Sequence, residues 1–238
     1  GTDESAQSGD AGWAFPNAAD ENGPIGDPNP DWEMGIGNTV SYKGAALNFL
    51  FDVRVGGDVW NGTRGVLYSY GTHADVGVET FVPADEAGDI YNFNGETVAE
   101  VGTPVTQDGV DGFRFRGRLH DWDGDGPAPT VALDEEWYRQ GLGNHFDGPA
   151  EQFVEDGSFF RLRELSLSYD WAPELLRSVT GSASSVRVSV IGRNLWLLTD
   201  YSGIDPETNV AGSGNGRGMD YFNNPSTRSY TFSLQFNY

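Results

Sequence analysis

The stretch Asp121-Trp-Asp-Gly-Asp-Gly126 is the part of the sequence closest in pattern to a chemical site. Its carboxylates, Asp121, Asp123 and Asp125, stand at alternate positions and are followed by glycine, as in the first half of a calcium-binding loop. Such a loop also needs a bidentate glutamate at its twelfth position, which here is Ala132. Two interpretations therefore stay open: a Ca²⁺ site with these three ligands, or a hydrated Asp/Gly turn.

The other reactive residue types give no sign of catalysis. His73, His120 and His145 have no spacing, among themselves or to carboxylates, that is typical of a zinc site or an acid–base pair. The sequence has no cysteine, which excludes disulfides and thiolate sites, and no Gly-x-Ser-x-Gly motif. We expect a protein that is not an enzyme and requires no cofactor, with Ca²⁺ as the one candidate ion.

Composition indicates many strands and an acidic surface. The 33 glycines and 13% aromatic residues, with only 37% hydrophobic residues, are typical of an all-β protein. The formal charge of −22 excludes nucleic acid as an expected partner, because phosphate binding needs a basic surface. The acidic residues gather in predicted loops, where a solvated surface, adaptation to salty water and calcium capture are the competing explanations.

Five segments alternate apolar and polar side chains with a period of two, which predicts strands with one apolar and one polar face. They cover about 32–42, 45–56, 158–170, 185–198 and 227–238, and the last ends the chain on alternating aromatic residues. These segments are longer than the usual strand of a globular protein. There is no run of 18 apolar residues that would predict a membrane-spanning helix, but a membrane-spanning strand needs only about 9–11 residues.

Short and long connections between these segments alternate. Lys43-Gly44 predicts a two-residue hairpin turn, whereas long loops are expected at 57–157 and 199–226, with a further loop at 1–31. In an antiparallel up-and-down sheet the short turns then fall on one side and the long loops on the other, as in transmembrane β-barrels with short periplasmic turns and long extracellular loops. The alternative is a soluble extracellular β-sandwich that binds glycans, because alternation alone does not say what covers the apolar face.

Several stretches resemble the C-terminal part of SusC/RagA-type TonB-dependent outer-membrane transporters. The resemblance runs in order from about residue 25 to the end of the chain, and it is carried by Ile-Gly-Asp-Pro-Asn-Pro-Asp-Trp (25–32), Gly-Gly-Asp-Val-Trp-Asn-Gly-Thr-Arg (56–64), Asp-Gly-Ser-Phe-Phe-Arg-Leu-Arg-Glu-Leu-Ser-Leu-Ser-Tyr (156–169), Gly-Arg-Asn-Leu-Trp (192–196), Tyr-Ser-Gly-Ile-Asp-Pro-Glu (201–207) and Tyr-Phe-Asn-Asn-Pro-Ser-Thr-Arg-Ser-Tyr-Thr-Phe (221–232).

The resemblance implies a 22-stranded barrel in the bacterial outer membrane that imports oligosaccharides or peptides. It also implies a SusD-like surface lipoprotein as a lid, and energy from a TonB complex that acts through an N-terminal part missing here. The 238 residues would then supply about five strands of the barrel and their extracellular loops, without the plug domain. The closing strand resembles the signal read by the barrel assembly machinery, which assigns that role to Tyr230, Phe232, Leu234, Phe236 and Tyr238. For Tyr238 the alternative is an aromatic residue of the membrane interface without that role.

Two further sets of residues are candidates for contact with cargo. Aromatic residues in the long loops can stack on sugar faces or simply hold the loops in place. They are Trp60, Trp122, Trp137 and Tyr201. Charged residues on the polar parity of the strands are expected to face the barrel lumen, where they can form a hydrogen-bonded lining or hold the plug. They are Asp52, Arg54, Glu164, Arg187 and Arg193.

Overall fold

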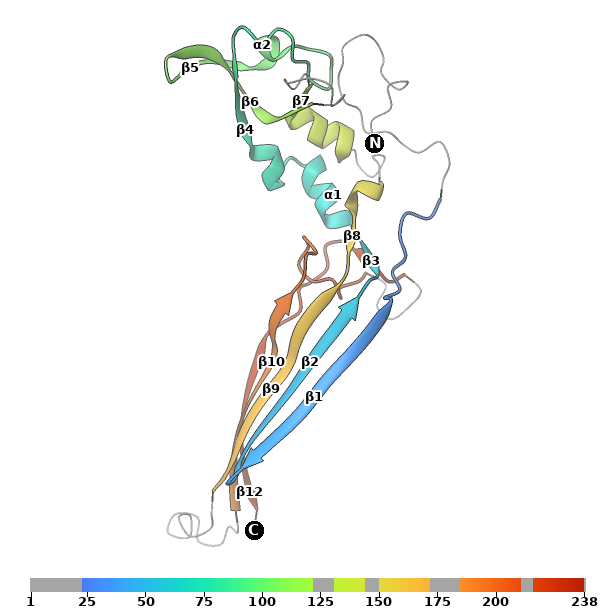
Figure 1. Ribbon diagram of the computed structural model, residues 1–238, viewed down its shortest axis with the longest axis vertical. Helices are drawn as coiled ribbons and strands as arrows, with labels where there is room; N and C mark the ends of the chain where they lie inside the picture. Colours follow the sequence, from blue (N-terminus) through green and yellow to red (C-terminus); the bar gives the residue numbers. More distant parts are fainter. Residues whose placement is uncertain (1–22, 122–130, 144–149, 172–184, 211–215, 238) are drawn as a thin grey trace. The chain divides into compact units, whose positions relative to one another are not determined.

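The computed structural model describes residues 23–121, 131–143, 150–171, 185–210 and 216–237 (Figure 1). The chain divides into two compact units, which we describe separately. The sheet unit comprises Gly26–Val59 and Glu155–Tyr238, and the insert unit comprises Gly1–Ile25 and Trp60–Val154.

A five-stranded antiparallel sheet forms most of the sheet unit, in the order β1-β2-β9-β10-β12. Its long strands run side by side in Figure 1. They are β1 (Trp32–Tyr42), β2 (Ala45–Val55), β9 (Phe159–Trp171), β10 (Ser185–Leu198) and β12 (Ser229–Asn237). Within the described residues, β1 and β12 each pair along one side only, so the sheet is open at both edges.

The first hairpin has the turn that its two central residues predict. Lys43 has a φ of 47° and Gly44 a φ of 86°. Positive φ at both positions is the geometry of a type I′ turn, whose twist matches that of the strands it joins. A Cβ on Gly44 would lie 3.0 Å from the backbone oxygen of Asp170, so glycine is required there for space as well as for conformation.

Two irregularities interrupt the ladder on either side of β9. The register shifts between Leu50 and Phe51 where β2 pairs with β9, and between Arg193 and Trp196 where β10 pairs with β9. Asn194 lies in the second irregularity with a φ of 52°. A bulge therefore breaks the period of two at that point.

The two faces of the sheet differ sharply in polarity. One cross-strand row consists of Val40, Leu47, Leu167, Val190 and Phe232. These side chains are 38–79% exposed. The neighbouring row on the opposite face consists of Thr39, Asn48, Ser166, Ile191 and Thr231 and is mostly polar. We call the first surface the apolar face and the second the polar face.

The apolar face continues past the bulges as a run of aromatic rings. Phe51 stacks on Phe160 with 5.1 Å between ring centroids, and Phe160 meets the edge of Trp196 at 5.8 Å. The described residues of the sheet unit show no second layer stacked over this face, which is the layer that a β-sandwich would require.

A second, short sheet has three strands in the order β11-β3-β8. They are β11 (Met219–Asp220), β3 (Asp58–Asn61) and β8 (Val154–Asp156).

The insert unit has its own antiparallel sheet, in the order β4-β6-β5, with β7 also paired to β6. Its strands are β4 (Glu79–Pro83), β5 (Thr103–Gln107), β6 (Val110–His120) and β7 (Val131–Asp134). Its helices are α1 (Gly62–Ser69), η2 (Ala74–Gly77), α2 (Val98–Val101), the π-helix η3 (Trp137–Leu142) and η4 (Ala150–Phe153). No helix among the described residues is long and apolar enough to cross a membrane.

Two clusters of buried side chains hold the insert unit together. One comprises Val82, Ala87, Ile90, Val98, Phe115 and Ala132. The other comprises Tyr68, Val76, Tyr138 and Phe153. The expectation of one long loop over 57–157 is therefore corrected: this part of the chain folds around its own core, because its short strands bury apolar side chains against each other and against the helices.

Candidate functional site

Charged side chains on the polar face pair across neighbouring strands. Arg54 lies 2.8 Å from Glu33, Arg187 lies 2.6 Å from Asp170, and Arg193 lies 3.0 Å from Glu164. Asp52 accepts hydrogen bonds from Nε and Nη2 of Arg163 at 3.0 and 2.6 Å. All five residues expected to face the barrel lumen, Asp52, Arg54, Glu164, Arg187 and Arg193, thus take part in ion pairs; their lumen-facing position stays a prediction.

A buried ion pair fastens the segment after β10 to this face. Nη2 of Arg161 lies 2.5 Å from Oδ1 of Asp205 and 3.2 Å from Oε2 of Glu207. Oε1 of Glu207 also lies 2.5 Å from Arg163, so this one carboxylate joins both arginines of β9. Ser226 donates a hydrogen bond to Asp205 as well. We call this group the arginine clamp: Arg161, Arg163, Asp205, Glu207 and Ser226.

Hydrogen bonds outweigh burial in setting the pKa of Asp205 in the clamp. Burial alone would raise the pKa of Asp205, but hydrogen bonds from Arg161 and Ser226 lower it below its ordinary value. A buried arginine is stable only with such compensation, because an unpaired charge in a dry site is costly. Sequence reasoning missed the clamp, because its members lie far apart in the chain, with Arg161 and Asp205 separated by 44 positions.

Tyr201, expected to stack on sugars, is buried and hydrogen-bonded instead. Its side chain is 5% exposed, and its hydroxyl donates to Oδ2 of Asp220 at 2.7 Å. Burial and the neighbouring Asp220 carboxylate both raise the pKa of Tyr201. The sugar-stacking role is therefore corrected for this residue, because its ring is covered by protein.

Trp60 and Trp137 pack against the second core cluster of the insert unit. The ring of Trp137 meets Tyr138 edge-on at 4.9 Å. A Cβ on Gly62 would lie 2.4 Å from the Trp60 ring, so the ring lies directly over that glycine. Both tryptophans are partly buried, and their observed contacts hold the insert unit together. Trp122 lies outside the described residues.

The structure does not test the calcium interpretation, which stays a prediction. Asp121 is described, but Asp123 and Asp125 lie outside the described residues. Within the described part of the chain, no group of three or more His, Cys, Asp or Glu side chains is arranged to hold a metal ion. Tyr238 of the closing strand also lies outside the described residues, whereas Tyr230, Phe232, Leu234 and Phe236 lie exposed along β12.

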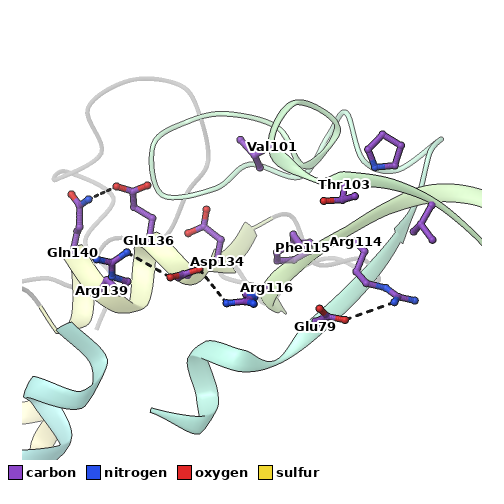
Figure 2. Close-up of a pocket in the computed structure, with 13 residues that line it drawn as sticks. Glu79, Val101, Thr103, Arg114, Phe115, Arg116, Asp134, Glu136, Arg139 and Gln140 are labelled. Carbon is purple, nitrogen blue, oxygen red and sulfur yellow. Dashed lines mark hydrogen bonds and ion pairs between the residues drawn. The ribbon is translucent and has the colours of Figure 1, made fainter. Parts of the chain in front are cut away.

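A cavity of about 620 Å³ opens in the insert unit, between β5 and η3 (Figure 2). Three arginines and four acids are among its lining residues: Arg114, Arg116, Arg139, Glu79, Asp134, Glu135 and Glu136. Figure 2 shows side chains on and beside η3 along one side and Val101 and Thr103 along the other. We call this cavity the insert pocket.

The ion pairs in the insert pocket are longer than normal hydrogen bonds. Glu135 lies between two arginines, 3.9 Å from Arg116 and 3.5 Å from Arg139. Arg114 lies 3.7 Å from Glu79. Asp134 accepts hydrogen bonds from Asn92 and from the backbone N–H of Trp137, yet burial raises its pKa above the ordinary value. These long ion pairs leave N–H donors and oxygen acceptors able to bind a ligand.

Comparison with known proteins finds relatives of one class. No family model matches the chain. This chain is 30% identical over 219 residues to TonB-dependent receptor P3 of Formosa agariphila, and the matched region covers 90% of this chain and 17% of that protein. TonB-dependent receptor P26 of the same organism is 25% identical over 221 residues, with 88% of this chain and 17% of that protein covered. The chain thus spans about a sixth of the length of the curated relatives it matches.

Solved structures show a weaker likeness. The RagAB peptide importer in its closed-closed state is 18% identical with a TM-score of 0.48, covering 87% of this chain and 17% of the matched chain. The same importer in its open-open state gives a TM-score of 0.49 and 18% identity, with 88% and 17% covered.

Proposed function

We propose that this chain is a segment of a SusC/RagA-type TonB-dependent receptor of the bacterial outer membrane and forms part of the barrel wall of an active importer; its likeness to two TonB-dependent receptors supports this assignment. The observation that carries this proposal is the exposed cross-strand row of the apolar face. Soluble monomers rarely expose contiguous apolar patches of more than a few hundred Å². Lipid tails satisfy such a surface, and the paired charges of the polar face then line the lumen.

The open edges of the sheet support the same proposal. An unpaired strand edge presents rows of N–H and C=O groups, which are costly in a bilayer unless another strand pairs with them. β1 and β12 would each pair with a further strand of a 22-stranded barrel. The exposed aromatic side chains of β12, with Tyr238, would serve as the signal for the barrel assembly machinery.

The proposed cargo is an oligosaccharide or a peptide, taken up with a SusD-like surface lipoprotein and with energy from a TonB complex. The relatives named as TonB-dependent receptors support the energy source. The lipoprotein partner and the carbohydrate cargo rest on the sequence resemblance alone. The long segments 57–157 and 199–226 are proposed to lie on the extracellular side, where they would meet cargo and lipoprotein.

Fractionation and co-purification test this proposal. The whole receptor that contains this chain should stay in the outer-membrane fraction, require detergent to remain monodisperse, and bring down a surface lipoprotein when purified through a tag. Deleting its gene should abolish uptake of the cargo. A receptor that is monodisperse in plain buffer would contradict the proposal and would favour the soluble glycan-binding β-sandwich.

A further inference from the structure

The insert pocket has the size and lining of a ligand site. Its volume of about 620 Å³ lies within the range typical of small-molecule sites. Its polar groups converge from separate elements, since Arg114 and Arg116 lie on β6, Glu79 on β4 and Arg139 on η3. A cavity whose planar charged groups come from several elements is suited to hold one ligand in a fixed orientation.

Charge balance in the pocket favours a neutral ligand. Its three guanidinium groups and four carboxylates nearly cancel, and Glu135 lies against both Arg116 and Arg139. A carboxylate or sulfate on the ligand would meet the pocket's acids, and an ammonium group would meet its arginines. The separations of 3.5–3.9 Å exceed normal hydrogen-bond lengths, so a hydroxyl group placed nearby can bond to either member of a pair.

The wall of the insert pocket across from η3 offers apolar contact in addition to these polar groups. Val101, Pro104 and Val105 line it. A sugar ring presents C–H groups on its faces and hydroxyl groups around its rim, which matches a wall of this kind opposed to planar charged side chains.

The strand beside the pocket disfavours an extended peptide. β5 pairs with β6 along one side, and its other edge is open among the described residues. A peptide could bind there by adding a strand, which uses backbone hydrogen bonds. Pro104, the second residue of β5, removes one N–H donor, and proline is tolerated mainly where the missing donor would face away from the sheet. The open edge is therefore short of a donor beside the pocket.

We propose that the insert pocket binds a neutral oligosaccharide segment through the Arg116–Glu135–Arg139 group and the Val101–Val105 wall. This inference rests on the proposed importer function and chooses between its two cargo classes. It assigns the binding to the insert unit, apart from the barrel wall and from the tryptophans that pack in the insert unit's core.

Binding by the whole receptor in detergent tests the proposal. The probes are short neutral oligosaccharides of glucose, galactose, mannose or xylose, their uronate-containing and sulfated counterparts, and a tryptic peptide mixture, first as an array and then by calorimetry. Neutral oligosaccharides should bind. Val105→Trp, which fills the pocket, should weaken that binding about tenfold or more, whereas Val110→Trp, the same change at an exposed position outside the pocket, should leave it unchanged.

A second variant probes charge selectivity and does not depend on filling the pocket. Glu135→Gln removes the carboxylate that Arg116 and Arg139 share, so both guanidinium groups can pair with a carboxylate on the ligand and the receptor should gain affinity for uronate-containing oligosaccharides. Glu86→Gln, the same change at an exposed site of the insert unit, should give no gain. The proposal is overturned if only peptides or acidic glycans bind, if no probe binds, or if Val105→Trp and Val110→Trp behave alike. If the receptor gives such a result but needs detergent and resides in the outer membrane, only the pocket assignment is wrong. The proposed importer function then stands.

Discussion

Arg161 and Asp205 form an ion pair in which both side chains are only 2% exposed, with 2.5 Å between Nη2 and Oδ1. Arg161 lies on β9, and Asp205 lies in the segment that follows β10. The pair therefore fastens a connecting segment to the polar face, and Glu207 adds a second point through Arg163. A segment held in this way cannot move freely away from the sheet.

Asp205→Asn should loosen this segment. The variant leaves Arg161 buried with Glu207 as its remaining acidic partner, and breaking one member of a buried pair costs about 3 kcal/mol or more of stability. Limited proteolysis of the whole receptor should show faster cleavage within 199–210. Asp200→Asn is the matched control, because Asp200 lies in the same segment but is exposed. Equal cleavage rates for the two variants would show that the pair does not restrain the segment.

The pH dependence of the clamp follows from the same aspartate. The folded-state pKa of Asp205 is lowered, so the folded state binds fewer protons than the unfolded state over the window between the two pKa values. Its stabilising contribution is therefore fully present above the ordinary aspartate pKa and is lost as the pH falls through the lower folded value. Proteolysis of 199–210 should accelerate in strong acid in the wild type, and Asp205→Asn should show less of this acceleration.

Tyr201 offers a test that separates packing from sugar stacking. Tyr201→Phe keeps the ring and removes only the hydroxyl that donates to buried Asp220, which should cost about 1–3 kcal/mol of stability. Thermal unfolding of the whole receptor in detergent measures this loss. An unchanged unfolding temperature for Tyr201→Phe would show that the hydroxyl–Asp220 hydrogen bond does not stabilise this segment.

An introduced charge should cost more stability on the apolar face of β9 than on its polar face. Leu167 lies on the apolar face and Ser168, its neighbour, on the polar face. Leu167→Arg should destabilise the receptor by about 2–4 kcal/mol if it lies near the bilayer midplane, and by less toward an interface. Ser168→Arg should cost much less, because the polar face already carries arginines. Outer-membrane yield and the temperature of unfolding in detergent compare them, and equal losses would count against lipid on the apolar face.

The long strands were predictable because each has one apolar and one polar face, which gives its sequence a period of two. β1, β2, β9, β10 and β12 lie where alternation placed strands, with ends that differ by a residue or two. The Lys43-Gly44 turn was predictable for a local reason, since few residue pairs tolerate positive φ twice. Alternation did not predict the bulge at Asn194, because an inserted residue depends on the ladder of the neighbouring strands.

The insert unit was missed because its signals are short. Asp108 and Gly109 form a second two-residue turn, with φ values of 51° and 84°, and this Asp-Gly pair is a hairpin signal that the sequence offered. Three of its four strands, β4, β5 and β7, have only four or five residues, too few for a period of two to stand out, whereas β6 has eleven and was missed despite its length. The insert pocket and the arginine clamp join residues far apart in sequence, which a single sequence does not bring together.

The contact between the apolar face and lipid is tested most directly by electron paramagnetic resonance along β9. This chain has no cysteine, so single cysteines for spin labelling can be introduced at positions 165–169 of the receptor in lipid vesicles, with cysteines elsewhere in the receptor replaced. Labels at 165, 167 and 169 should be relaxed mainly by oxygen dissolved in the bilayer, and labels at 166 and 168 should be less accessible to oxygen. Equal oxygen accessibility at all five positions, or preferential relaxation of 165, 167 and 169 by a water-soluble nickel complex, would contradict a lipid-facing wall.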